Sequence, residues 1–191
     1  MTPYLVVTTG FPCAGKTQAS LYLQQELGFT RFSTDDLREN LYGITDYHSF
    51  QKDSKFREKE DMVFRLMMEG KMLSVLYGID VVLDSSASSE LMRTYLLDTR
   101  VKEGIVPAEK SLLYINAKDE ILIKRNKDKG RRNDPVSEWK KFWEEPKENQ
   151  HYNLISYENN TESDLEHMIL DLDKRFRRDK NKMFGVIKPG E

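Results

Sequence analysis

Short apolar runs alternate along the chain with longer segments in which apolar residues recur every three or four positions. The apolar runs read YLVVTT, FTRFS, IDVVLD, SLLYIN and YNLISY. The longer segments, which this spacing predicts to be helices, cover about 16–27, 34–42, 55–77, 88–103, 117–129, 136–144 and 162–176. Strands that alternate with helices are typical of layered α/β domains. We therefore expect an α/β fold with a five-stranded, mostly parallel sheet and helical crossovers.

The length of 191 residues suits one domain with a sizeable core, so we assign residues 1–191 to a single domain. The formal net charge is only -2, but the basic residues are clustered. The basic stretches are KRNKDKGRR and KRFRRDKNK, and the second opens a basic C-terminal tail at about 174–191. We expect local basic patches, not the field of the whole molecule, to bind anions.

The single cysteine, Cys13, cannot form an internal disulfide, and the spacing of His48, His151 and His167 does not suggest a zinc site. No segment approaches the ~18 consecutive apolar residues that a membrane span needs. The N-terminus lacks the pattern of a secretory signal. These features predict a soluble, cytoplasmic protein that does not associate with membranes.

The stretch GFPCAGKT fits the phosphate-binding loop motif, and it lies between an apolar run and a predicted helix. In this motif the backbone N–H groups around Gly10, Ala14 and Gly15 turn toward phosphate, and the helix N-terminus adds partial positive charge. Lys16 would reach the outer phosphates, and the hydroxyl group of Thr17 would ligate magnesium. The motif predicts binding of a nucleoside triphosphate with Mg²⁺. The alternative is a glycine-rich turn without a ligand.

The stretch STDDLREN follows the second apolar run, and it places Asp35 and Arg38 three residues apart on one helical face. A carboxylate beside a cation suits an acceptor that carries a hydroxyl group to be deprotonated and a phosphate to be anchored. The structural alternative is a helix cap, in which Ser33 and Asp36 form a capping box. The cap explains Asp36 but not Asp35 and Arg38, so we favour Asp35 as the base.

Asp84 ends the apolar run IDVVLD, and ligands of parallel α/β folds bind at this edge of the sheet. Three roles are open for it. Its carboxylate could ligate magnesium through water, it could orient Arg38, or it could cap the following helix.

A basic stretch after the fourth apolar run, EILIKRNKDKGRRNDP, starts as a helix and ends in a loop broken by glycine and proline. Arg125 lies in the helical part, whereas Arg131 and Arg132 follow the glycine. We expect a lid at about 125–137 that brings arginines over the triphosphate. A solvated basic face is the alternative.

Three aromatic residues follow the expected lid. Trp139, Phe142 and Trp143 are spaced for one face of the helix expected at 136–144. That face could pack against the sheet or stack on a nucleobase.

Over roughly residues 3 to 135, the chain resembles the phage-type polynucleotide 5′-hydroxyl kinase family and the related zeta-toxin-like kinases. The stretches that carry the resemblance are GFPCAGKT, STDDLREN, VVLDSS and LIKRNKDKG. The resemblance implies a P-loop NTPase fold of the nucleotide-kinase-like type, with three layers and an arginine-bearing lid.

The resemblance also implies roles for single residues. Lys16 and Thr17 would bind ATP and Mg²⁺, and Asp35 would activate the acceptor 5′-hydroxyl group. Arg38 would hold the neighbouring phosphate of a nucleic-acid 5′-end, either DNA or RNA, and Arg125 would contact the donor phosphates. We therefore place Lys16, Asp35 and Arg125 in the catalytic set. From their positions in the sequence, in the expected lid and at the sheet edge, we place Arg131 in the ATP-binding set and Asp84 in the metal-binding and substrate-binding sets.

The chain departs from this family after the third apolar run. The family has an Asp-Thr-Asn-like start followed by arginines, whereas this chain reads DSSASSELMRT, so Arg93 is the remaining substrate-binding candidate. The stretch DLDKR mimics the start of the phosphatase motif of bifunctional relatives, but it lies in a helical pattern with little chain after it. We expect no phosphatase in this chain.

Three function hypotheses follow. The first is an ATP-dependent kinase for the 5′-hydroxyl group of a polynucleotide. The second is a kinase for a small hydroxyl-bearing metabolite, nucleoside or sugar nucleotide. The third is a nucleotide-dependent switch without an acceptor, which gives no reason for a base at Asp35.

Overall fold

The structure, a computed structural model, describes residues 1–130 and 135–178. The strands are β1 (Tyr4–Thr9), β2 (Thr30–Ser33), β3 (Val81–Asp84), β4 (Arg100–Val101), β5 (Gly104–Ile105), β6 (Glu109–Asn116) and β7 (Asn153–Glu158). The helices are α1 (Lys16–Leu27), α2 (Thr34–Tyr42), α3 (Tyr47–Phe50), α4 (Phe56–Leu76), α5 (Glu90–Leu97), α6 (Asp119–Asp128), α7 (Pro135–Trp139) and α8 (Glu162–Phe176). They alternate with the strands as the hydrophobic pattern predicts.

The main sheet has five strands in the order β2-β3-β1-β6-β7, and all neighbouring pairs are parallel. β1 lies at the centre, where Val6 is in register with Val82 of β3 and Ser111 of β6. The expected five-stranded α/β fold is therefore confirmed. The carboxyl end of β1 leads into residues 10–15, which places the predicted phosphate-binding loop at the ligand-binding edge of the sheet.

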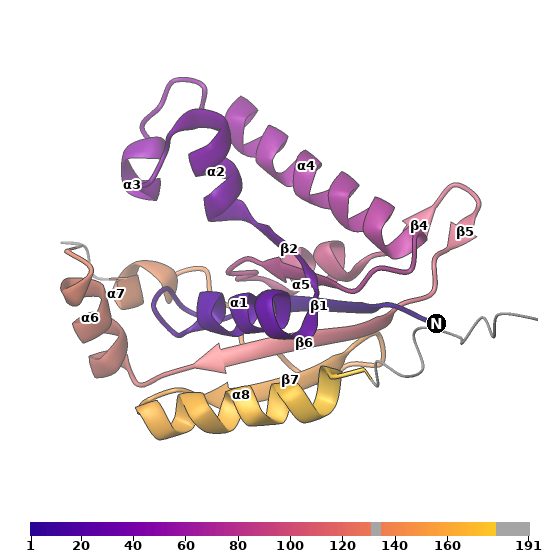
Figure 1. Cartoon of the computed structure of the whole chain (residues 1–191). Helices are drawn as coiled ribbons and strands as arrows, with labels where there is room; N and C mark the ends of the chain where they lie inside the picture. The colour runs from indigo at the N-terminus through magenta and orange to yellow at the C-terminus, as the bar shows by residue number, and fades with distance from the viewer. Residues whose placement is uncertain (131–134, 179–191) are drawn as a thin grey trace, which may run out of the picture.

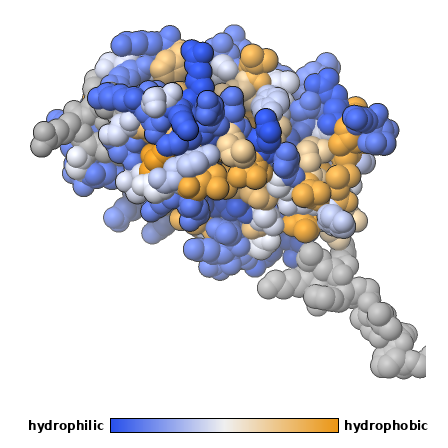
Figure 2. Space-filling view, turned by 90° about the horizontal axis from the view of Figure 1, so that it is seen from above, coloured by the Kyte–Doolittle hydropathy of each residue, from blue (hydrophilic) through white to orange (hydrophobic). Residues whose placement is uncertain are grey.

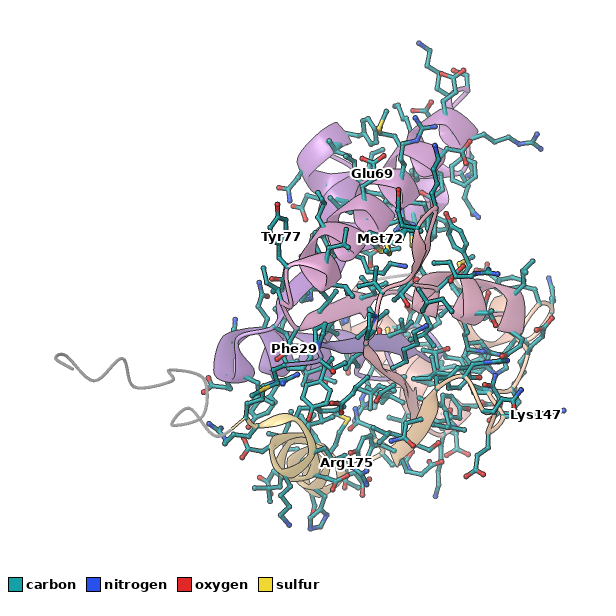
Figure 3. The ribbon with its side chains drawn as sticks, turned by 90° about the vertical axis from the view of Figure 1, so that its right-hand side faces the viewer. Phe29, Glu69, Met72, Tyr77, Lys147 and Arg175 are labelled. Atoms are coloured by element: carbon teal, nitrogen blue, oxygen red, sulfur yellow. The ribbon has the colours of Figure 1, made fainter. Side chains whose placement is uncertain are left out.

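The sheet is covered by helices on both faces, which makes three layers (Figure 1). The alternation of side chains along β1 determines the two faces, because Val6 packs on the α1 and α8 side whereas Leu5 and Val7 pack on the α4 and α5 side. Figure 3 shows α4, with Glu69 and Met72, and α8, with Arg175, at opposite sides of the sheet. Each face has its own apolar core.

Two predicted helices are wrong in extent. The helix expected at 88–103 ends at Leu97, because the carboxylate of Asp98 accepts a hydrogen bond from the backbone N–H of Arg100 (3.0 Å) and turns the chain. β4 and β5 then form a short antiparallel pair. The helix expected at 136–144 ends at Trp139, and the N–H of Glu144 donates to the carbonyl of Ser88 (2.9 Å).

The molecular surface over α4 carries both charged and hydrophobic side chains (Figure 2). Exposed apolar residues of this helix are Met62, Leu66, Leu73 and Leu76. Within the described ranges, every helix is too short or too polar to cross a lipid bilayer.

Candidate active site

The phosphate-binding loop depends on glycine at two positions. Gly10 has φ 142, and a Cβ there would lie 2.1 Å from the carbonyl oxygen of Ile115. Gly15 has φ 115, and a Cβ there would lie 2.2 Å from Nδ2 of Asn159. Both positions need positive φ and close backbone approach, so a side chain would distort the loop. The two glycines of the motif therefore occupy the positions where the backbone of the loop requires glycine.

Lys16 begins α1 beneath this loop, and only 9% of its surface is exposed. Its Nζ atom donates to the carbonyl oxygens of Gly10 (2.9 Å) and Phe11 (2.8 Å). Burial lowers the pKa of Lys16 to about 8, although attraction to Asp84 and Asp35 opposes this shift. Phosphate oxygens placed in the loop could replace the two carbonyl groups as partners of Nζ.

Asp84 ends β3 as expected, and its carboxylate is almost fully buried. Oδ2 accepts from the hydroxyl group of Ser20 (2.8 Å) and from Nη2 of Arg31 (2.6 Å). The side chain of Ser89, not Asp84, caps α5, so the predicted helix-cap role is wrong. The structure also pairs Asp84 with Arg31 and not with Arg38.

Arg31 is a site residue that the sequence analysis missed. It lies on β2, its side chain is 5% exposed, and it forms ion pairs with Asp84 and Asp36. Its Nε atom also donates to Ser20 Oγ (2.9 Å). An arginine inside a four-residue strand gave no local signal, because its partners come from α1, α2 and the end of β3.

Asp35 and Arg38 lie together on α2, as their spacing predicts. Nη1 of Arg38 donates to Asp35 (2.6 Å), while Nε and Nη2 donate to the two carboxylate oxygens of Glu60 on α4 (2.9 and 2.6 Å). The guanidinium group also lies 4.7 Å from the ring centre of Tyr47. Hydrogen bonding and attraction from Glu60 and Asp35 raise the pKa of Arg38 against the effect of burial. Glu60 and Tyr47 were missed because they lie on α4 and α3, outside the helix that carries Arg38.

The start of α2 is capped by Ser33 as the sequence predicts, but the reciprocal half of the expected capping box is replaced by a contact between the Asp36 carboxylate and Ser33 Oγ. Ser33 is the N-cap residue, and its hydroxyl group accepts from the backbone N–H of Asp36 (3.2 Å). The carboxylate of Asp36 also interacts with Ser33 Oγ (3.1 Å) and with Arg31. Asp36 therefore has a structural role in the helix cap and in the ion pair with Arg31, whereas the side chain of Asp35 is 82% exposed.

Arg125 of α6 lies beside the phosphate-binding loop. Nη1 donates to the carbonyl oxygen of Cys13 (3.4 Å), and Nη2 donates to Oδ1 of Asn159 (3.5 Å). These long contacts hold the guanidinium group loosely. Asn159, another missed residue, is buried and donates to the carbonyl oxygen of Ala14 (2.7 Å). The predicted lid residues Arg131 and Arg132 lie outside the described residues.

Arg93 is fully buried on α5, away from any accessible surface. Its Nε donates to Glu90 (3.1 Å) and Nη1 to the carbonyl oxygen of Ala87 (3.1 Å). Among the described residues, nothing pairs with its Nη2. The structure therefore does not bring Arg93 into contact with the other predicted substrate-binding residues.

Trp143 packs against Phe11 of the phosphate-binding loop, with ring centres 4.8 Å apart, and its Nε1 donates to Glu145 (2.9 Å). It borders a pocket of ≈ 450 Å³ near the carboxyl ends of β6 and β7. The helix expected to carry Trp139, Phe142 and Trp143 stops at Trp139, so the three residues do not share one helical face. Trp139 and Trp143 nevertheless pack against the apolar core, as the packing alternative expects. Phe142 is largely exposed.

The donor set at the loop fits magnesium better than a metal that needs a full protein cage. Within the described residues, no group of three His, Cys, Asp or Glu side chains could hold a metal ion. Thr17 on α1 and one oxygen of Asp84 are oxygen donors near the loop. Mg²⁺ is usually bound by one or two protein oxygens together with phosphates and water.

The comparisons with known proteins agree with this fold. A protein-family model described as AAA domain, AAA_33, matches residues 5–142. A search of curated protein sequences found no significant match.

Solved structures resemble the chain at low identity. A provisionally assigned kinase from Chloroflexus aurantiacus J-10-fl is 16% identical, with TM-score 0.68 over 93% of this chain and 100% of its own. A sugar kinase from Janibacter sp. HTCC2649 is 17% identical, with TM-score 0.60 over 93% of this chain and 99% of its own. A chain of the Pnkp1/Rnl/Hen1 complex is 21% identical, with TM-score 0.51 over 65% of this chain and 39% of its own. These likenesses support the P-loop fold.

Because the family model covers most of the chain, the protein belongs to the AAA_33 family of AAA domains.

Proposed function

We propose that this member of the AAA domain family transfers the γ-phosphoryl group of ATP to a hydroxyl group, most specifically the 5′-hydroxyl group of a polynucleotide. The observation that supports this proposal is the position of Asp35. Its carboxylate is 82% exposed and lies close enough to the phosphate-binding loop to attract Lys16. A nucleotide switch has no use for an exposed carboxylate at this place, whereas a kinase needs a base there.

The donor half would bind ATP through the loop backbone and Lys16. Lys16 stabilises the charge that grows on the transferring group, and Arg125 approaches from α6 to add a second positive charge. Magnesium would be held by Thr17, the ATP phosphates and water, with Asp84 nearby, and it would neutralise phosphate charge.

In the acceptor half, Asp35 accepts the proton of the acceptor hydroxyl group while the oxygen of that hydroxyl group forms a bond to the γ-phosphorus. The bond between that phosphorus and the bridging oxygen of ADP breaks, and ADP leaves with the electron pair. One carboxylate oxygen of Asp35 accepts a hydrogen bond from Arg38, so the other carboxylate oxygen is available to the acceptor hydroxyl group.

Arg38 is the basis for the polynucleotide acceptor. Nη1 and Nη2 each carry two N–H groups, and each makes one contact with the described residues, to Asp35 and to Glu60. The second N–H of each nitrogen can donate to a phosphate that flanks the 5′-hydroxyl group. Glu60 and the ring of Tyr47 would hold the guanidinium group in position.

A specific observation favours a second candidate, a kinase for a small metabolite such as a sugar. Asp35, Glu60 and Arg38 together carry one surplus negative charge, which repels a phosphate and suits a neutral polyol. A sugar kinase is among the structures that resemble the chain.

The discriminating experiment compares acceptors. Catalytic efficiency with ATP is measured for a nucleoside 3′-phosphate, for the same nucleoside without phosphate, and for a panel of sugars. For a polynucleotide kinase, the 3′-phosphate should raise efficiency by about tenfold or more, and Arg38→Ala should remove that preference.

Arg65→Ala is the matched control, because Arg65 is an exposed arginine on α4 and should leave the preference unchanged. Transfer to a sugar without a preference for the phosphorylated nucleoside would support the second candidate and reject the first. ATP hydrolysis without transfer to any acceptor would reject both.

A further inference from the structure

Arg31 joins the donor and acceptor halves of the site. Its guanidinium group lies between the carboxylates of Asp84 and Asp36, and its Nε donates to Ser20 of α1. The side chains of Arg31 and Asp84 are 5% and 6% exposed, so little solvent screens this pair. The hydroxyl group of Ser20 donates to the same Asp84 oxygen that Arg31 contacts. Four elements thus meet at one guanidinium group.

We propose that Arg31 is a positioning residue that neutralises Asp84 beside the nucleotide phosphates and fixes the start of α2 relative to the phosphate-binding loop. This inference rests on the proposed function, because it assigns to Asp84 and α2 the donor and acceptor sides of a kinase.

The first part follows from the geometry of Asp84. Oδ2 is committed to Arg31 and Ser20, whereas the contact that the described residues make with Oδ1 is a long one, 3.4 Å from the hydroxyl group of Thr8. That oxygen could accept a hydrogen bond from a water on bound Mg²⁺, while Arg31 offsets the charge of Asp84. Without Arg31, a buried and unbalanced carboxylate would face the phosphates. It would repel nucleotide that has no metal and would attract Mg²⁺ more strongly.

The second part follows from the neighbour of Asp35. Asp36 is the next residue on α2, and its ion pair with Arg31 ties this turn of the helix to β2. A planar guanidinium group can reach Asp36, Asp84 and Ser20 at once, whereas a lysine ammonium group on its flexible chain cannot hold the same three directions. Arg31 thus orients Asp35 without touching the acceptor.

The test measures ADP affinity by calorimetry, once in excess magnesium chloride and once in EDTA, and takes the ratio of the two dissociation constants. The gain in affinity that magnesium gives is the dissociation constant in EDTA divided by the dissociation constant in magnesium chloride. In Arg31→Met, this gain should be at least about fivefold larger than in wild type. In the double variant Arg31→Met/Asp84→Asn, which restores charge balance, this gain should return toward the wild-type value. A purely structural loss would weaken both measurements alike, so an unchanged ratio overturns the proposal.

Asp84→Asn covers the case in which Arg31→Met does not fold. It removes one negative charge from the site while Arg31 keeps its ion pair with Asp36, so metal-free ADP should bind more tightly and the gain from magnesium should fall. An unchanged gain in this variant overturns the proposal. Arg100→Met is the matched control, because Arg100 pairs with Asp98 near β4 and should leave the gain as in wild type. A rise equal to that of Arg31→Met would show an unspecific effect and overturn the assignment.

Arg31→Lys separates the two parts. It keeps the charge, so the gain from magnesium should stay near wild type, while kcat for phosphoryl transfer should fall several-fold with little change in the KM for ATP. Unchanged kcat would overturn the positioning of α2. ADP binding needs no acceptor, so the metal measurement tests Arg31 even if wild type transfers to no acceptor, an outcome that would reject only the proposed function.

Discussion

The donor half of the site is held by its backbone, whereas the acceptor half is held by ion pairs between side chains of different helices and strands. Gly10 and Gly15 shape the donor loop through positive φ and through close contacts with Ile115 of β6 and with the side chain of Asn159. On the acceptor side, Glu60 of α4 fixes Arg38, and Arg31 of β2 fixes Asp36. A backbone loop tolerates few changes but is encoded locally, while an ion-pair network can be altered one residue at a time. We therefore expect the acceptor half to be the part of this fold in which specificity can change without loss of nucleotide binding.

The substitution with the largest expected effect should lower turnover without changing nucleotide binding. Asp35→Asn keeps the size of the side chain but removes the base, so kcat should fall by roughly 10²–10⁴-fold. ADP affinity should not change beyond about twofold, because the donor loop is held independently. Single-turnover kinetics and calorimetry check both values. A folded Asp35→Asn protein with near-normal turnover would exclude Asp35 as the base.

Lys16→Ala should act on the donor half. Turnover should fall at least ~100-fold, because Lys16 stabilises charge on the transferring group. Lys71 provides a contrast. Burial also lowers its pKa to about 8. Its Nζ, however, donates to the carbonyl oxygens of Leu96 (3.2 Å) and Asp98 (2.5 Å), far from the loop. Lys71→Met should lower the free energy of unfolding by ~1–3 kcal/mol and leave kcat unchanged. Near-normal turnover of folded Lys16→Ala would refute the phosphate-binding role.

The sequence predicted what is encoded locally. The strands, the helix over 162–176, the donor loop and the cap at Ser33 all depend on neighbouring residues, and the structure contains them. Glu60, Arg31 and Asn159 could not be found, because each acts through a partner at least 22 positions away or on another element. The helix at 88–103 failed for a related reason, since a side chain of the turn competed with the helical pattern.

The pH dependence of ADP binding should report on Lys16 in the donor half. The pKa of Lys16 is about 8 in the free protein, and bound phosphates should raise it because they favour the charged form. ADP affinity should then fall by up to about tenfold per pH unit as pH rises above 8, since binding requires uptake of a proton. Calorimetry from pH 7.5 to 9.5 measures this. In Lys16→Arg, which stays charged, the affinity that remains should be nearly independent of pH. The same slope in both proteins would assign the titration to another group.

The smallest expected effect concerns the cap of α2. Ser33→Ala removes the acceptor for the N–H of Asp36 and should lower the free energy of unfolding by ~1 kcal/mol, within the range of about 0.5–2 kcal/mol for lost caps. Thr161→Ala at α8 is the matched control, because its hydroxyl group accepts from the N–H of Asp164 (3.1 Å) in the same way. The two variants should lose similar stability in urea unfolding. Only Ser33→Ala should also raise the KM for the acceptor, by a few-fold, because α2 carries Asp35 and Arg38 whereas α8 carries no acceptor residue. ADP affinity should be unchanged in both variants. An equal rise in acceptor KM for Thr161→Ala would mean that the acceptor half responds to global stability and is not positioned by the start of α2.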